Sequence, residues 1–150
     1  MAHTFLMQPG KWTLEGNWLE RDARPIAIKG RTLVAWSKDN FWFTMVSKIG
    51  FSSDNRDELT LAYKGRIDPD ERHFTFVLDH SELGRVEGEG LISPDAIVQR
   101  YWVLGDKRMR TGFQTFYRAD ENHYHLSGGL TAGQNLENMI DAVLIRHPDS

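Results

Sequence analysis

The sequence predicts an all-β fold: a single antiparallel up-and-down β-barrel of about ten strands with little helix. Three observations support this prediction. Short runs rich in β-branched and aromatic residues alternate apolar with polar side chains and end at turn sequences. Glycines recur inside these runs, as expected where the strands of a small barrel bend sharply. The 150-residue length fits one domain, so residues 1–150 are expected to form one barrel.

Alternation identifies the first five strands. At residues 11–21 and 25–37, apolar side chains recur at every second position, interrupted only by a glycine in each run and by Thr32 in the second, which is the period of a half-buried strand. Residues 41–51 are apolar on both faces. Residues 59–67 and 72–80 alternate again, and the turn sequence DPDE lies between them.

Turn sequences delimit the next four strands. Residues 85–92 follow the turn SELG, and the turn SPDA separates them from residues 97–104. The sequence GDKRM precedes residues 110–118, and ADEN precedes residues 123–130. Short strands and turns at this spacing are typical of an all-β sandwich or barrel.

The last segment fits two structures. Its apolar residues have the i, i+3, i+4, i+7 and i+8 spacing of an amphipathic helix: Leu136, Met139, Ile140, Val143 and Leu144. Read at period two, Ile140, Ala142 and Leu144 share one face of a strand. We expect a strand at 136–146, because nine strands leave open edges that a tenth strand, paired with the first, would close. An eight-strand barrel followed by a C-terminal helix is the alternative fold.

Composition narrows the class of protein. The chain has no cysteine, so a disulfide framework is excluded and a reducing compartment is allowed. No apolar run is long enough for a signal peptide, or approaches the roughly 18 residues that cross a bilayer. We therefore expect a soluble, cytoplasmic protein with no membrane span. The net charge is -3 and no basic block stands out, so a nucleic-acid partner is not expected.

Two short motifs at opposite ends of the chain resemble the calycin superfamily, which includes lipocalins and fatty-acid-binding proteins. Gly10 and Trp12 form the G-x-W that opens such barrels, and Arg146 ends the last predicted strand. The resemblance implies that Gly10, Trp12 and Arg146 close the barrel, with the guanidinium lying across the indole. Such a cation–π contact contributes about 0.5–2 kcal/mol.

The C-terminal stretch is also similar to the nitrobindins, which are ten-stranded haem-binding barrels. The matching residues are Gly133, Gln134, Leu136, Ala142, Leu144 and Arg146, and Ile140 replaces a leucine. Met139 stands where nitrobindins have the histidine that binds ferric haem. The resemblance therefore implies a nitrobindin-like barrel without its haem-ligating histidine. Methionine commonly fills irregular apolar gaps, so Met139 is expected to be filling inside the barrel or a ligand contact.

Aromatic residues supply most of the candidate ligand-binding side chains. Arg100 and Trp102 share one strand face, and if that face points inward Arg100 can bind a carboxylate or propionate. If it points outward, Arg100 is an ordinary rim charge. Trp36 and Trp42 flank a turn and can line the mouth of a barrel, although a hydrophobic plug or a dimer contact would use the same residues. The ligand-binding candidates are Trp36, Trp42, Arg100, Trp102 and Met139.

Two further pairs suggest chemistry but favour simpler interpretations. His123 and His125 share a strand face without a third metal ligand nearby, so a solvated face is favoured over a metal site. Glu87 and Glu89 have the spacing of an acid–base pair, but flanking glycines favour tight curvature. No nucleophile motif, phosphate-binding loop or zinc motif is present, so no catalytic or metal residue is assigned and no cofactor is indicated.

The function that these patterns favour is non-catalytic binding of a small, largely apolar ligand in the barrel lumen. A fatty-acid-like or tetrapyrrole-like molecule would suit aromatic walls, because small barrels of this kind can hold one ligand. The alternative is a barrel plugged by its own side chains that acts as an interaction or assembly protein, with a homodimer as the expected form. The second alternative is an enzyme that resembles the bilin lyases.

Overall fold

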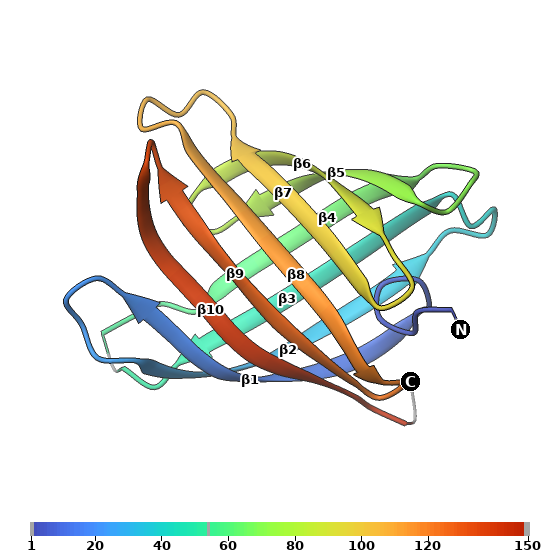
Figure 1. The fold of residues 1–150 in the computed structure, drawn as a ribbon, viewed down its shortest axis with the longest axis horizontal. Coiled ribbons are helices and arrows are strands. Elements are labelled where there is room, and N and C mark those ends of the chain that lie inside the picture. Colours follow the sequence, from blue (N-terminus) through green and yellow to red (C-terminus); the bar gives the residue numbers. More distant parts are fainter. Residues whose placement is uncertain (1, 54, 149–150) are drawn as a thin grey trace.

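The computed structural model describes residues 2–53 and 55–148. Ten antiparallel strands form one closed barrel in which every strand pairs with its neighbours in sequence (Figure 1). The strands are β1 (Gly10–Glu20), β2 (Ile26–Trp36), β3 (Trp42–Phe51), β4 (Leu59–Ile67), β5 (His73–His80), β6 (Gly84–Ile92), β7 (Ala96–Val103), β8 (Arg110–Asp120), β9 (His123–Ala132) and β10 (Asn135–Arg146). The all-β prediction is confirmed. The described part of the chain contains no helix that could cross a bilayer.

The pairing of β1 with β10 closes the sheet. Their register runs from Trp12 opposite Arg146 to Glu20 opposite Asn138. The strand prediction for the last segment is therefore confirmed, and the helical alternative is wrong. Local periodicity favoured a helix, but the free edges of β1 and β9 are satisfied only when this segment is extended. A register shift between Leu136 and Asn138 marks a bulge at the start of β10.

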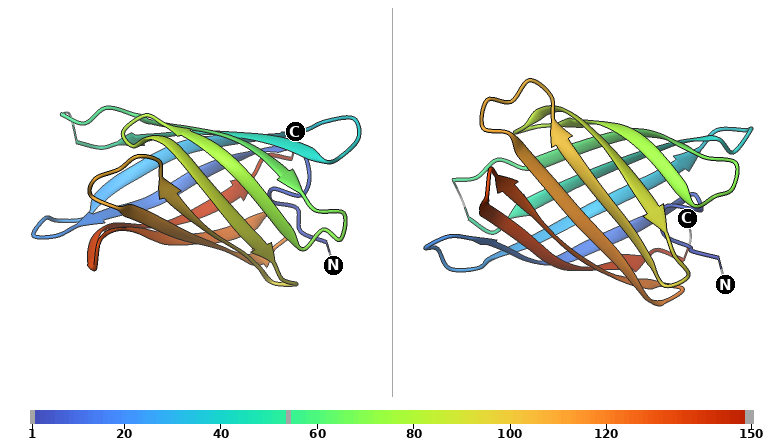
Figure 2. Two further views of the ribbon diagram at one scale, coloured as in Figure 1. Left: turned by 90° about the horizontal axis from the view of Figure 1, so that it is seen from above. Right: turned by 45° about the horizontal axis from the view of Figure 1, so that its top comes forward.

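Large rings fill much of the barrel interior because glycines make room for them. Four inward-facing aromatic residues lie directly opposite a glycine on the next strand, and a Cβ atom on any of these glycines would collide with the ring. The pairs are Phe43 with Gly65, Phe74 with Gly90, Phe76 with Gly88, and Tyr101 with Gly112. The strands cross the barrel at a slant, in opposite directions on its two sides (Figures 1 and 2).

The segment that precedes β1 closes one end of the barrel, which we call the plugged end. Phe5 is buried there between Trp12, Phe116 and Tyr124, with ring centroids 4.8–5.6 Å from its own. His3 is also buried, and its Nε2–H donates to the carbonyl oxygen of Ser93 at 2.6 Å. A plugged barrel is one of the alternatives that the sequence leaves open, but the sequence does not indicate that the segment before β1 forms the plug, because a non-repetitive segment carries no periodic signal.

The expected contact between Arg146 and Trp12 takes a different form. The two residues are register partners, as the barrel-closing role requires. However, no cation–π contact joins them among the described residues; Phe5 and Tyr124 pack edge-on against the indole instead. The guanidinium of Arg146 donates to the side-chain oxygen of Gln8 at 3.3 Å. The buried plug thus takes the place that the cation was expected to fill.

Candidate ligand site in the barrel lumen

Three of the sequence-predicted ligand contacts lie on the outer surface. Trp42 is 44% exposed, and its ring lies beneath the cations of Lys64 and Arg66. Arg100 is exposed beside Trp102, with its guanidinium carbon 5.8 Å from the centre of the indole. The sequence left the orientation of Arg100 open, and in the structure its side chain points outward. None of these three side chains lines the lumen, because their strands point the alternate residues inward.

The other two predicted contacts lie at different depths. Trp36 faces the barrel interior at the plugged end, where its indole Nε1–H donates to the carbonyl oxygen of Leu6 at 2.8 Å. Met139 alternates with Asn138 and Ile140, which line the lumen, so its side chain lies on the outer face of β10. It is therefore not filling inside the barrel.

The lumen contains two small adjoining cavities. The cavity toward the open end, which we call the mouth, has a volume of about 40 Å³, and the cavity toward the plug has a volume of about 30 Å³. Phe5 of the plug forms part of the floor of the second. Both cavities share one girdle of wall residues: Ile49, Leu61, Tyr63, Gln114 and Ile140. They therefore form two chambers along the same interior path.

Neutral polar groups project into the barrel interior from β4, β7 and β8. Gln99 is 2% exposed, and its amide nitrogen donates to the side-chain oxygen of Gln114 at 2.6 Å. Burial raises the pKa of Tyr101 to about 12. Burial likewise raises the pKa of Tyr63, with Gln99 opposing the shift. Both phenols therefore remain protonated at neutral pH, and each can donate a hydrogen bond to a guest.

His80 supplies a further neutral donor at the mouth. Its Nδ1 atom accepts hydrogen bonds from the backbone N–H groups of Glu82, at 3.1 Å, and Leu83, at 3.2 Å. Because these donors cannot accept, Nδ1 is unprotonated and the neutral ring carries its proton on Nε2. Burial, with a smaller contribution from the charge of Arg110, lowers the pKa of His80 to about 4. At neutral pH the ring therefore offers the mouth cavity an N–H donor without charge.

One side of the mouth is covered by a single arginine. The Arg56 guanidinium lies 4.3 Å from the ring centre of Phe51 and 5.2 Å from that of Trp18. It forms an ion pair with Glu20, which also accepts the indole N–H of Trp18 at 2.8 Å. The hydrogen bond from Arg56 lowers the pKa of Glu20, and the hydrogen bond from Trp18 lowers it to a smaller extent. Trp18 lines the mouth cavity, so Arg56 lies directly above an entrance residue.

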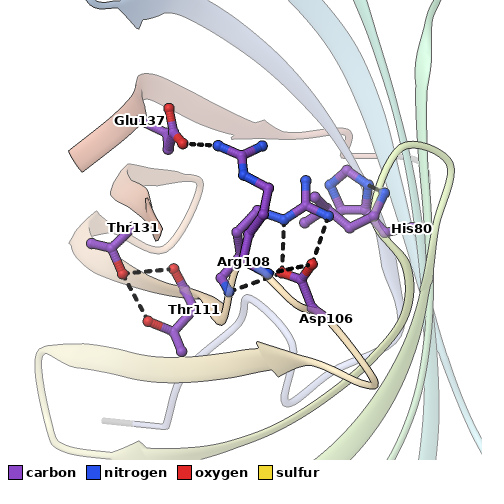
Figure 3. A network of polar contacts seen from close by, with 8 residues as sticks. His80, Asp106, Arg108, Thr111, Thr131 and Glu137 are labelled. Atoms are coloured by element: carbon purple, nitrogen blue, oxygen red, sulfur yellow. Dashed lines mark hydrogen bonds and ion pairs between the residues drawn. The ribbon is translucent and has the colours of Figure 1, made fainter. Parts of the chain in front are cut away.

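The β7–β8 connection forms the rim near His80. Asp106 accepts hydrogen bonds from the Nε–H of Arg110, at 2.8 Å, and from the backbone N–H of the same residue. These hydrogen bonds lower the pKa of Asp106 to about 2. Arg108 pairs with Glu137 across the rim. Figure 3 shows this network beside His80, with Thr131 hydrogen-bonded to its cross-strand neighbour. Arg108 and Arg110 are thus paired with carboxylates, and their charge stays outside the lumen.

The described walls of both cavities contain no Lys, Arg, Asp or Glu. No group of three His, Asp or Glu side chains suited to a metal occurs in the described residues. Chemically, the site can hold an apolar body and donate hydrogen bonds to it from Tyr63, Tyr101 and His80. The arrangement does not supply a nucleophile paired with a base.

Sequence reasoning missed Tyr63, Gln99 and Gln114 as lumen residues. The available signal was the position of Gln99, on the face of its strand opposite Arg100. Once that face is known to be internal, a glutamine among aromatic and aliphatic neighbours marks a buried polar site. The face itself is fixed only by closure of the barrel.

Comparison with known proteins adds evidence on the fold. No protein-family model matches the sequence, and no curated protein matches it significantly. Among solved structures, Rv2717c from M. tuberculosis superposes with a TM-score of 0.70 at 18% identity, covering 93% of this chain and 92% of that chain. The S-type phycobiliprotein lyase CPES from Guillardia theta superposes with a TM-score of 0.68 at 9% identity, covering 95% and 89%.

The closed ten-stranded barrel that the two chain ends led us to expect is confirmed, and its fold is similar to the folds of these two proteins. At identities this low, the superpositions establish the fold alone, and the lyase activity belongs to the Guillardia protein.

Proposed function

We propose that the protein binds a small, uncharged, largely apolar molecule in the barrel lumen without transforming it. The supporting observation is the pair of adjoining cavities, whose polar lining consists only of neutral groups. A buried carboxylate without a cation would be costly, so any charge on the ligand stays at the rim.

The size of the cavities limits the ligand. A water molecule needs at least about 10–15 Å³ of such volume, so the two chambers together hold only a few waters. A larger guest enters only if side chains move, and Trp18 beneath Arg56 is the side chain best placed to do so. A tetrapyrrole or a long fatty acid is less favoured, because each is far larger and carries carboxylates that meet no lumen cation.

The proposal is tested by titration with N-phenyl-1-naphthylamine, an uncharged apolar probe that enters only if Trp18 and its neighbours move and whose fluorescence rises on binding. We expect saturable binding that is lost in Ile49→Phe, because Ile49 lines both cavities. The matched control, Val77→Phe, adds a ring at an outward, half-exposed position and should bind as the parent does. Absence of binding, or equal loss in both folded variants, would contradict a lumen site.

Ferric haemin provides a second arm of the test. We expect no Soret shift typical of a histidine-ligated site, because the residue at the nitrobindin ligand position, Met139, lies outside the lumen. A tight, saturable shift that disappears in Met139→Ala would overturn this expectation. Native mass spectrometry of protein purified without added ligand would report any bound small molecule and the subunit count together.

A second candidate function, an interaction or assembly protein that forms a homodimer, is favoured by the outer surface. Leu91 and Val98 are register partners, and both are exposed, as are the nearby Phe113 and Tyr117. An apolar area of this kind often marks a protein contact. A dimer in native mass spectrometry that becomes a monomer in Phe113→Asp would support this candidate, whereas a monomeric parent would exclude it.

A further inference from the structure

Cations outnumber carboxylates on one side of the barrel. The strands β2, β3 and β4 contain five cationic side chains and no Asp or Glu, although the chain as a whole has a net charge of -3. A sixth cation lies next to them on β1. All six side chains are exposed on the outer surface: Lys11, Lys29, Arg31, Lys48, Lys64 and Arg66. We call this surface the basic face (its strands run side by side in Figure 1).

The cations of the basic face are not arranged for stability. Arg31 lies directly opposite Lys48 in the β2–β3 register. Like charges at directly opposed positions destabilise a sheet. Of the six cations, only Lys29 forms an ion pair within the described residues, with Glu15 at 3.6 Å. Stability alone does not account for the placement of Arg31 opposite Lys48. This placement favours a role in binding an anionic partner.

Apolar side chains lie among these cations. Leu33, 50% exposed, is the register partner of Val46, 37% exposed, and Lys11 is the partner of Leu33 on its other side. Together with Arg31 and Lys48 they line an open groove of about 510 Å³. The groove therefore has an aliphatic floor with cations along its rim.

The end of the basic face at the β2–β3 turn carries two exposed rings, Phe41 and Trp42. Lys64 and Arg66 lie over the Trp42 indole, at 5.9 and 5.7 Å from its centre. Amphipathic rings next to cations are typical of surfaces that contact the boundary between lipid head groups and acyl chains.

We propose that the basic face docks onto a membrane surface that contains anionic lipids. Lipid head groups supply negative charge opposite Lys11, Arg31 and Lys48, which form no ion pair within the described residues, and the upper acyl region can cover Leu33, Val46 and Trp42. A nucleic acid satisfies fewer of these features, because its bases could stack on Phe41 and Trp42 but would find no stacking surface on Leu33 and Val46. Docking of this kind leaves the lumen untouched and does not depend on the proposed ligand.

The experiment is co-sedimentation of the protein with phosphatidylcholine vesicles, with and without phosphatidylglycerol. We expect binding only to the vesicles with phosphatidylglycerol, and its loss at high salt, because added ions screen the attraction. The double variant Arg31→Gln/Lys48→Gln should partition about thirtyfold more weakly, as expected when two cations near a charged membrane are neutralised. Its thermal midpoint should not fall, because the substitution removes a repulsion.

The matched control is Arg85→Gln/Arg100→Gln, which removes the same charge from the exposed outer faces of β6 and β7. It should bind phosphatidylglycerol vesicles as the parent does. The proposal is overturned if the parent does not sediment with these vesicles, or if both double variants lose binding equally. Tighter, salt-sensitive binding to a single-stranded oligonucleotide or to polyglutamate would assign the face to that class of partner and also overturn it.

Discussion

At the scale of single residues, Trp12 is the side chain on which the plugged end depends. It is 1% exposed, with Phe5 and Tyr124 packed edge-on against its indole. Its Nε1–H has no hydrogen-bond partner among the described residues. An unsatisfied buried donor costs about 1–3 kcal/mol, so the packing of the ring must outweigh that cost.

We predict that Trp12→Ala lowers the free energy of unfolding by about 3–5 kcal/mol, the usual cost of truncating a large core aromatic. Urea unfolding followed by circular dichroism measures the change. Trp42→Ala is the control, and because Trp42 lies on the outer surface it should change stability by less than about 0.5 kcal/mol. Equal effects of the two substitutions would show that the indole of Trp12 is not a core element.

At the scale of elements, neighbouring strands pack together where an aromatic ring on one strand lies opposite a glycine on the next. On β5 and β6, Phe74 and Phe76 lie opposite Gly90 and Gly88, and the two rings are stacked 6.1 Å apart. The ring of each pair occupies the space above its glycine, where a Cβ atom would otherwise be. Each glycine therefore contributes to stability indirectly, because it leaves room for the ring opposite it.

Gly90→Ala is predicted to destabilise the protein by about 1–3 kcal/mol, because the added methyl group forces the Phe74 ring out of its position. Gly50→Ala, also in a strand, provides the comparison. A Cβ atom there would meet only an ordinary contact, 3.7 Å from the Lys29 carbonyl oxygen, and should cost little. Thermal unfolding of the two variants side by side measures the difference, and a neutral Gly90→Ala would contradict the packing argument.

The strands could be predicted from sequence, but the faces of several could not. Period-two patterns and turn residues located β1 to β9 because both signals are local. On β7, local alternation allows either Arg100 or Gln99 to face inward, and only the closed sheet places Gln99 inside. The predicted site accordingly emphasised Arg100 and Trp102, which lie outside, whereas the lumen is lined by Gln114 and Tyr63.

The basic face could not be predicted from the sequence, for a related reason. Its cations are separated along the chain by apolar residues and turns, so the sequence contains no basic block. Folding brings Arg31 and Lys48 together from strands that are adjacent only in space. The expectation that no nucleic acid binds stays a prediction, and the oligonucleotide arm of the vesicle experiment tests it.

At the scale of the whole molecule, histidine titration should govern stability in mild acid. Burial lowers the pKa of His80 to about 4 and also lowers the pKa of His3. The unfolded chain therefore takes up protons on these rings from about pH 6.5 downward, while the folded chain does not. The hydrogen bonds that His73 donates to Glu89 and Asp68 raise its pKa, so its smaller contribution is lost as pH rises instead.

We predict that stability falls as pH is lowered from about 6.5 toward 4, with His80 contributing on the order of 3 kcal/mol. Urea midpoints measured across this range give the slope. His80→Asn keeps an acceptor for the backbone N–H groups of Glu82 and Leu83 and should flatten the curve. An unchanged slope in His80→Asn would refute the assignment.

The seam between β1 and β10 also determines when the chain can fold. Trp12 and Arg146 are far apart in the sequence but are paired in the sheet. The barrel therefore cannot close until the last strand has emerged from the ribosome. Contacts between such distant residues make folding slow compared with proteins rich in local contacts. During synthesis β1 lacks its partner, and the nascent protein is then most exposed to pairing with other chains.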